Sequence, residues 1–220
     1  MARASTHRSR ARFIARVLPG AKIAPFPAYI APSRVTARKK PPTGDGWLHE
    51  ITRDGWRVQA RLSEGRTTIV GEGGEDCTEQ FASIAAALAA IPANDIVLDG
   101  EVAQDGEGPR NPSASRKELR AGRTNGLVLY AFDLLYLDGF DIRAAPLVER
   151  KRVLRELLDA LPSRITYSDH VEGDGATVLA HACAMGLAGI ISKRAAAPHR
   201  PSSGPDWITV KCSVSAAKKK

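Results

Sequence analysis

The sequence lacks the features that mark membrane and zinc-binding proteins. It contains no apolar run of the roughly 20 residues that a membrane-spanning helix needs, and no uninterrupted apolar stretch follows its basic N-terminus. Neither a transmembrane helix nor a secretory signal is therefore expected. The three cysteines, Cys77, Cys183 and Cys212, show no Cys-x-x-Cys spacing and cannot all pair. They indicate reduced thiols of a cytosolic protein, without zinc.

Acidic residues are absent from the first 40 positions, which hold ten lysines and arginines. The last three residues are lysines, whereas the residues between these ends carry 19 basic and 24 acidic groups, or a charge of −5. All of the net charge of +8 therefore lies at the two ends. A protein whose body clasps nucleic acid is expected to carry a basic face there, and these totals do not favour one.

Length and composition are those of one globular domain. The chain has 220 residues, of which 43% are hydrophobic and 25% charged, so it can bury a sizeable core. Three segments are expected: a basic disordered tail over residues 1–22, a folded domain over residues 23–212 and a Lys-rich tail over residues 213–220. The first tail is either a phosphate-binding arm, through Arg3, Arg8, Arg10, Arg12 and Arg16, or a solubilising extension.

Residue patterns predict strands interrupted by helices. The long apolar run over residues 127–137 predicts a central strand that is buried on both faces. Helical spacing is found over residues 81–91, 147–161 and 174–185. The second of these helices can form an inward stripe of Leu147, Val153, Leu154, Leu157 and Leu158. Further strands are expected over residues 66–70, 189–193 and 207–211, and a short helix within residues 115–120.

Two Asp-Gly pairs predict tight turns, because glycine tolerates the positive φ that such turns need. Asp54-Gly55 is expected to join two strands as a hairpin, and Asp99-Gly100 to turn a second one within residues 95–102. Since the strands do not alternate regularly with the helices, the predicted fold class is α+β, with antiparallel sheets and flanking helices.

Five segments follow one another in an order that carries more information than any one of them. The first is His49-Glu50-Ile51-Thr52-Arg53-Asp54-Gly55-Trp56-Arg57. The others are Leu98-Asp-Gly-Glu-Val102, Leu129-Tyr-Ala-Phe-Asp-Leu-Leu-Tyr-Leu-Asp-Gly139, Gly189-Ile-Ile-Ser-Lys-Arg194 and Asp206-Trp-Ile-Thr-Val-Lys-Cys212. Over residues 24–212 this series resembles the adenylation domain of bacterial ATP-dependent DNA ligases of the end-joining type. That resemblance implies a ligase-type, ATP-grasp-like nucleotidyltransferase domain, here without the oligonucleotide-binding barrel.

The resemblance also implies a nucleotide site that binds ATP with Mg²⁺. It places Glu50 on the strand that leads to the nucleophile, Arg57 near the sugar and Glu101 at the ribose or metal. Phe132 is expected to stack on adenine, because an aromatic face packs on any base. Lys193 and Lys211 are expected at the α-phosphate, where positive charge stabilises the transferring group.

Several positions depart from the family pattern. The family's nucleophile is a lysine, which forms a covalent bond to AMP, and its position here is Thr52. A threonine hydroxyl is a far weaker nucleophile and needs a base to remove its proton. Ala188 stands where a metal-associated carboxylate is expected, Thr209 where a lysine is expected, and Glu72 where an arginine is expected.

These departures lead to two hypotheses about function. The favoured one is an adenylation-like domain without first-step catalysis, a pseudoenzyme that binds nucleotide or DNA or assists an active ligase or another end-joining protein in DNA repair and recombination. The alternative is an active ATP-dependent DNA ligase that joins nicks or breaks with a nucleophile from elsewhere, for which Lys39 and Lys40 are the nearby amines. Any DNA binding is expected to use the basic tails, and the expected location is cytoplasmic, with nucleoid association left open.

Overall fold

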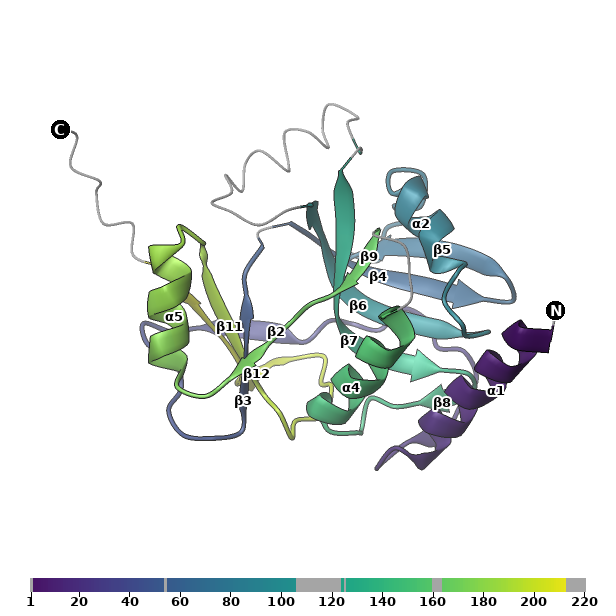
Figure 1. The fold of residues 1–220 in the computed structure, drawn as a ribbon, viewed down its shortest axis with the longest axis horizontal. Coiled ribbons are helices and arrows are strands. Elements are labelled where there is room, and N and C mark those ends of the chain that lie inside the picture. The colour runs from purple at the N-terminus through teal and green to yellow at the C-terminus, as the bar shows by residue number, and fades with distance from the viewer. Residues whose placement is uncertain (1, 54, 106–123, 125, 160–163, 213–220) are drawn as a thin grey trace.

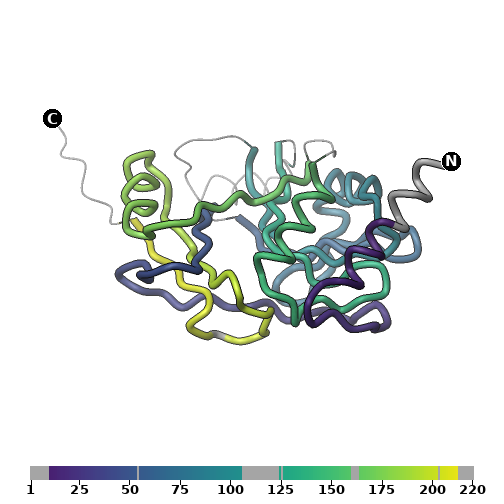
Figure 2. Tube along the Cα trace, turned by 60° about the horizontal axis from the view of Figure 1, so that its bottom comes forward, coloured from purple at the N-terminus to yellow at the C-terminus, as the bar shows by residue number. Residues whose placement is uncertain are grey.

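The computed structural model of the chain describes residues 2–53, 55–105, 124, 126–159 and 164–212. Two β-sheets form its two lobes (Figures 1 and 2). The helices are α1 (Ala2–Val17), α2 (Ala82–Leu88), α4 (Leu147–Leu158) and α5 (Gly175–Ala184). The strands are β1 (Lys22–Ile23), β2 (Arg34–Ala37), β3 (Trp47–Ile51), β4 (Trp56–Ser63), β5 (Arg66–Gly71), β6 (Ile96–Gln104), β7 (Leu127–Leu137), β8 (Phe140–Asp141), β9 (Ile165–Tyr167), β10 (Val171–Glu172), β11 (Gly189–Arg194) and β12 (Ser203–Lys211).

The larger sheet has seven strands and holds the main core. Its order is β1-β8-β7-β6-β4-β5, with β9 paired in parallel to β7. One face carries apolar side chains such as Val58, Leu98 and Leu129, which pack into one cluster with the buried faces of α2 and α4. The inward stripe predicted for α4 is confirmed, since all five of its residues are buried. The long buried strand is confirmed as well, with the predicted bounds.

The smaller sheet has five strands in the order β10-β3-β11-β12-β2. Its pairs are antiparallel except β12 with β2. Helix α5 covers one of its faces, where Leu179 packs beside the cluster of Trp47, Ile208 and Val210 (Figure 1). The fold is therefore α+β with mainly antiparallel sheets, as predicted.

Two local predictions are wrong, each for a different physical reason. Residues 47–51 and 56–63 do not form a hairpin, because β3 pairs with β11 in the small sheet while β4 pairs with β5 and β6 in the large one. The segment around Asp54-Gly55 thus links the two sheets, although Asp54 itself lies outside the described residues. Asp99-Gly100 does not turn either, because both residues lie within the continuous strand β6.

Glycine is needed at position 100 for close approach and not for a turn. A Cβ there would lie 2.9 Å from the Tyr130 carbonyl oxygen, at a point where the β6–β7 register shifts. The helix predicted within residues 115–120 lies outside the described residues.

The N-terminal segment is helical, which corrects the expectation of disorder over residues 1–22. Helix α1 has little apolar character. Nevertheless Ala11 and Ala15, four residues apart, are buried in the main core, and Leu18 joins them just beyond the helix. Small side chains of this kind let a helix approach a core closely, but they give only a weak periodic signal in the sequence.

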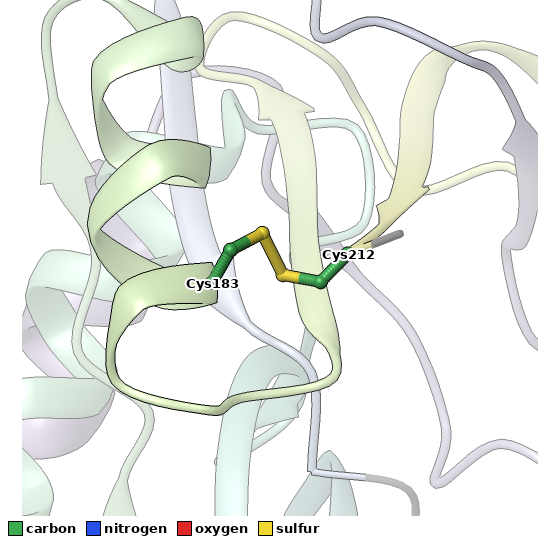
Figure 3. The surroundings of a disulfide bond; sticks show 2 residues. All are labelled: Cys183 and Cys212. Atoms are coloured by element: carbon green, nitrogen blue, oxygen red, sulfur yellow. A yellow bond between two sulfur atoms is a disulfide. The ribbon is translucent and has the colours of Figure 1, made fainter. Parts of the chain in front are cut away.

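The cysteines are not all reduced thiols. Cys183, at the end of α5, and Cys212, just after β12, form a disulfide (Figure 3). Cys77 is free and half-buried. The two bonded cysteines are 29 residues apart, so their pairing follows from the packing of α5 beside the end of β12 and not from a sequence motif.

Candidate functional site

One face of the small sheet gathers side chains from three of the five motif segments. Lys193 lies opposite Leu48 on β3 and Trp207 on β12, and Glu50 lies opposite Ile191. Because side chains alternate along a strand and directly paired residues share a face, Glu50, Lys193 and Trp207 point to the same side. This face is opposite the one that α5 covers.

A buried cluster of three charges forms at the centre of this face. The Glu50 carboxylate accepts hydrogen bonds from Lys193 Nζ and Lys151 Nζ, each at 2.9 Å, and from Ser168 Oγ at 3.1 Å. The side chains of both lysines are at most 1% exposed. Lys151 comes from α4, which packs on the large sheet, so the cluster joins the two lobes.

Burial and charge act against each other in this cluster. Burial raises the pKa of Glu50, but the charges of Lys193 and Lys151 outweigh it and hold that pKa below its ordinary value. Burial lowers the pKa of Lys193 to about 8, and the attraction of Glu50 offsets only part of that effect. The carboxylate therefore stays ionised, while Lys193 remains mainly protonated at neutral pH but loses its proton more easily than an ordinary lysine.

Thr52 lies directly beyond β3, at the edge of the same face. Its amide donates to the Gly189 carbonyl at 3.1 Å, which extends the β3–β11 pairing by one residue. Its Oγ1 is buried and has no hydrogen-bond partner among the described residues. The neighbouring Arg53 stacks its guanidinium on the Tyr130 ring, 3.5 Å from the ring centre. No described side chain is therefore placed to take a proton from Thr52.

The large sheet contributes a second set of side chains. Arg57 lies opposite Glu101 in the β4–β6 pair, and Asp99 lies two residues before Glu101, so all three share a face. The Arg57 guanidinium forms two hydrogen bonds with Asp99, at 2.7 and 3.1 Å, and a third with the Ser33 carbonyl oxygen at 2.6 Å. Glu101 accepts a hydrogen bond from the Gly55 amide. Arg57 is thus held in a fixed orientation by a carboxylate that the sequence analysis did not assign.

Two aromatic rings meet where the sheets approach each other. Phe132, on β7, contacts Trp207, on β12, edge to face with ring centres 5.8 Å apart. Lys193 Nζ lies 3.9 Å from the centre of the Phe132 ring and 4.4 Å from that of Trp207. The Arg57 guanidinium lies 5.4 Å from the Phe132 centre. The half-buried Phe132 therefore lies near two cations. The residue after it, Asp133, is fixed by a buried pair with Arg150 at 2.7 Å.

The structure brings most of the predicted site residues together. Glu50, Arg57, Phe132 and Lys193 are linked by the contacts above, and Glu101 shares the face of Arg57. Lys211 is exposed on β12 opposite Gly189, which places it across one strand from Thr52. Lys193 differs from expectation, because its amine is bound to Glu50 and enclosed by aromatic rings and does not project into open space.

The arginines of the N-terminal segment lie on α1, away from this site. Helix α1 packs on β7 and β8 of the large sheet. Arg12 and Arg16 are exposed, and Arg10 lies 3.8 Å from Glu156. The side chains of Arg3 and Arg8 lie outside the described part of the helix.

Sequence reasoning missed three residues of the site. Trp207 and Asp99 lie inside motif segments, so their positions in the motifs could have suggested them. Lys151 gave no such signal, because a lysine on an amphipathic helix is ordinarily exposed. It lies 101 residues from Glu50 in the sequence.

The described residues offer no site for a metal ion that is held by protein ligands alone. Among the described residues, no group of three or more His, Cys, Asp or Glu side chains could hold one. Mg²⁺ commonly uses one or two carboxylates and takes its other oxygens from nucleotide phosphates and water. Glu101 is the carboxylate that the resemblance predicts for such a nucleotide-bound ion, and this stays a prediction; Glu50 and Asp99 form ion pairs with Lys151 and Arg57.

Comparison with known proteins agrees with this geometry. The profile of the family described as "ATP dependent DNA ligase domain" matches residues 33–211. The chain belongs to this family. The resemblance seen in the motif segments and the fold class it implied are thereby confirmed.

Named relatives include multifunctional end-joining proteins. The chain is 34% identical over 192 residues to the "Multifunctional non-homologous end joining protein LigD" of Pseudomonas aeruginosa, a match that covers 86% of this chain and 23% of that protein. It is 32% identical over 200 residues to a "Probable DNA ligase" of Nocardioides sp., covering 87% of this chain and 38% of the relative. The chain thus spans well under half the length of these relatives.

Among solved structures, the ligase domain of M. tuberculosis LigD superposes with a TM-score of 0.69 and 28% identity, over 82% of this chain and 60% of that one. The "mycobacterial DNA ligase D complexed with ATP and MES" gives a TM-score of 0.68 at the same identity and coverage. Among the described residues, no helix is long and apolar enough to cross a membrane.

Proposed function

We propose that this chain is an adenylation domain of the DNA ligase type that has lost the first catalytic step and keeps part of its ATP site. The observation that carries the proposal is Thr52, which replaces the nucleophilic lysine. Its Oγ1 has no hydrogen-bonding partner among the described residues. A hydroxyl that attacks phosphorus needs a base within about 3 Å to accept its proton. Without one, the covalent AMP intermediate does not form.

The surrounding changes point in the same direction. By the resemblance, Ala188 lacks a carboxylate that would help to hold a metal ion, and Thr209 lacks a cation on β12, opposite Ile191 and beside Lys211. Each group stabilises charge on the transferring phosphate, so its loss lowers the rate even where a nucleophile is present. Restoring a single residue is therefore insufficient.

Nucleotide binding requires fewer groups than catalysis does. In the proposed complex the Phe132 ring stacks on adenine, Arg57 and Glu101 approach the sugar, and Lys211 approaches the phosphates. Arg57 is already oriented by Asp99, at 2.7 and 3.1 Å, so little side-chain entropy is lost when it contacts a nucleotide. Lys193 contacts a phosphate of the nucleotide only if its amine gives up the hydrogen bond to Glu50 and donates to the phosphate instead. ATP and Mg²⁺ are therefore expected to bind weakly.

A specific observation supports the alternative of an active ligase. Lys193 is a buried amine beside Phe132, and burial lowers its pKa to about 8. Such an amine is a better nucleophile at neutral pH than an ordinary lysine. Its bond to Glu50 at 2.9 Å, however, holds it in the protonated form in which it cannot attack. Lys39 and Lys40, the other candidates, line a cavity with Trp47, whose side chain belongs to the α5 face of the small sheet.

Incubation with α-labelled ATP and Mg²⁺, followed by a denaturing gel, tests the proposal. The expected result is no labelled band from the wild-type chain, and only a weak one from Thr52→Lys because Ala188, Thr209 and Glu72 remain. A wild-type band overturns the proposal. If Lys193→Met then abolishes that band, Lys193 is the nucleophile and the alternative holds.

The biological setting is part of the same proposal. The end-joining relatives suggest a cytoplasmic role in DNA repair, as a DNA-binding accessory or as a partner of an active ligase or another end-joining protein. Contact with DNA through the basic termini remains part of the proposal. The cations of α1 that are exposed for it include Arg12 and Arg16. Because α1 packs into the core through Ala11 and Ala15, substitution of these arginines tests the idea more cleanly than deletion of the helix.

A further inference from the structure

A basic cavity lies on the small sheet, away from the nucleotide site. It has a volume of about 670 Å³, and its lining includes four cations, Arg38, Lys39, Lys40 and Arg194, beside Trp47. All four cations are exposed. Among the described side chains that line the cavity, none is acidic.

The cavity and the nucleotide site are on opposite faces of the same sheet. Trp47 on β3 is paired with Arg194 on β11. The neighbouring pair consists of Leu48, the residue after Trp47, and Lys193, the residue before Arg194. Because successive side chains point to opposite faces, Trp47 and Arg194 project away from the side on which Lys193 meets Glu50. Ile208, which also lines the cavity, pairs with Ser192 and shares the face of Trp47. A ligand in this cavity does not compete with a nucleotide beside Phe132.

Several contacts hold the cavity in shape without a ligand. The Arg38 amide donates to the Thr209 carbonyl at 2.9 Å, which attaches the basic segment to β12. The Arg194 guanidinium lies over the Trp47 ring, 4.2 Å from its centre. Pro41 and Pro42 follow Lys40 and restrict the backbone there, because proline fixes its own φ and limits the residue before it. The cations are thus positioned by backbone and ring contacts.

The charge of this cavity is largely uncompensated. Arg194 lies 3.9 Å from Asp206, a long pair on the surface that contributes little. Three consecutive cations at positions 38–40 repel one another, and an anion that binds between them removes this repulsion. Arg38 can bind a phosphate through two donors at once, while the two lysines act as point charges.

We propose that this cavity binds the sugar–phosphate backbone of DNA. A backbone ligand fits better than a free nucleotide, because Trp47 is only 5% exposed and one face of its ring is covered by Arg194, so that little of the ring is open to a base. Binding is therefore insensitive to base sequence. The inference deepens the proposed DNA-binding role and rests on it for the identity of the polyanion. It adds a contact on the folded body, whose overall charge had argued against one.

Titration of a fluorescent DNA duplex across a range of salt concentrations, with the full chain, tests this inference. The pocket variant is Arg38→Gln/Lys40→Gln, and the matched control is Lys22→Gln/Arg66→Gln, which removes one arginine and one lysine that are exposed outside the cavity. Loss of each phosphate contact reduces the log–log salt slope by about 1. The pocket variant is therefore expected to lose about 2 from the slope and to bind at least about tenfold more weakly at low salt.

The outcomes separate this inference from the proposed function. If the pocket variant has the same salt slope as the control variant, the cavity is not a DNA site. If DNA binding is then lost in Arg12→Gln/Arg16→Gln, the proposed role of α1 in DNA binding still holds. No DNA binding by the wild-type chain overturns both. ATP affinity, measured by calorimetry, is expected to be the same in the pocket variant and the wild type. Thermal unfolding followed by circular dichroism checks that each variant is folded.

Discussion

Replacing Glu50 with glutamine removes a carboxylate that holds two buried lysines. Both amines lie 2.9 Å from it, and their side chains are at most 1% exposed, so water does not replace the lost charge. We expect Glu50→Gln to be among the most destabilising single substitutions in this domain, although it preserves the size and shape of the side chain.

The magnitude can be worked out from the two lysines separately. Breaking a buried ion pair by removing one partner costs about 3–5 kcal/mol, which is the cost assigned to Lys151. The cost from Lys193 is smaller, because this lysine can lose its proton in the folded protein. With a pKa of about 8, deprotonation at pH 7 costs about 1.4 kcal/mol for the one pH unit between them. The total is about 4–6 kcal/mol. For a domain of this size that corresponds to a fall in Tm of roughly 10–20 °C.

The pH dependence gives a second, independent expectation. The folded-state pKa of Lys193, about 8, is below its ordinary value of 10.5, so between these pH values the unfolded chain binds more protons and the contribution of Lys193 to stability rises with pH. The folded-state pKa of Glu50 is below its ordinary value of 4.5. Its contribution is present above that value and is lost as the pH falls further. In the Glu50→Gln variant, the free energy of unfolding should therefore not show this decrease at acidic pH. Above pH 8 the difference in stability between the variant and the wild type should become smaller.

Urea unfolding followed by circular dichroism, at several pH values, measures both effects. The control is Glu149→Gln, which breaks an exposed pair with Arg152 at 3.1 Å and should cost less than about 1 kcal/mol. A Glu50→Gln variant within about 1 kcal/mol of the wild type at pH 7 would contradict the ionised, buried cluster described above.

Three further expectations concern other parts of the chain. The double variant Cys183→Ala/Cys212→Ala should lose about 3–4 kcal/mol in urea unfolding, because the bridge closes a separation of 29 residues, and unchanged stability would show that the bridge does not form in solution. Phe132→Ala should weaken ATP binding at least tenfold in calorimetry, since base stacking contributes about 1–3 kcal/mol, and unaltered affinity would exclude this ring as the adenine platform. Arg12→Gln/Arg16→Gln should lower the salt slope of DNA binding by about 2, whereas an unaltered slope would remove α1 from the DNA interface.

Family and fold class could be predicted because they depend on local, ordered signals. The five motif segments carry side chains at fixed spacings, and the apolar run of β7 or the inward stripe of α4 reflects the period of a single element. The threonine at position 52 is likewise visible in the sequence alone, because one position in a motif defines it.

Pairings between distant elements were not predictable in this way. Asp54-Gly55 has the composition of a hairpin turn, but the strands on either side find better partners in different sheets, as the β3–β11 and β4–β6 pairs show. The disulfide depends on where α5 and the end of β12 meet. Helix α1 gave no clear pattern because alanines, and not large apolar residues, form its contact with the core.

The sequence by itself determined that this chain belongs to the ligase family and carries threonine at position 52, since residue identity at a motif position needs no other part of the chain. Only the tertiary structure decided that Glu50 binds Lys151 and Lys193, which lie 101 and 143 residues away. It also decided that four cations meet around Trp47 on the opposite face. Electrostatic interactions depend on distance in space and on exclusion of water, and the fold sets both of these between residues far apart in the chain.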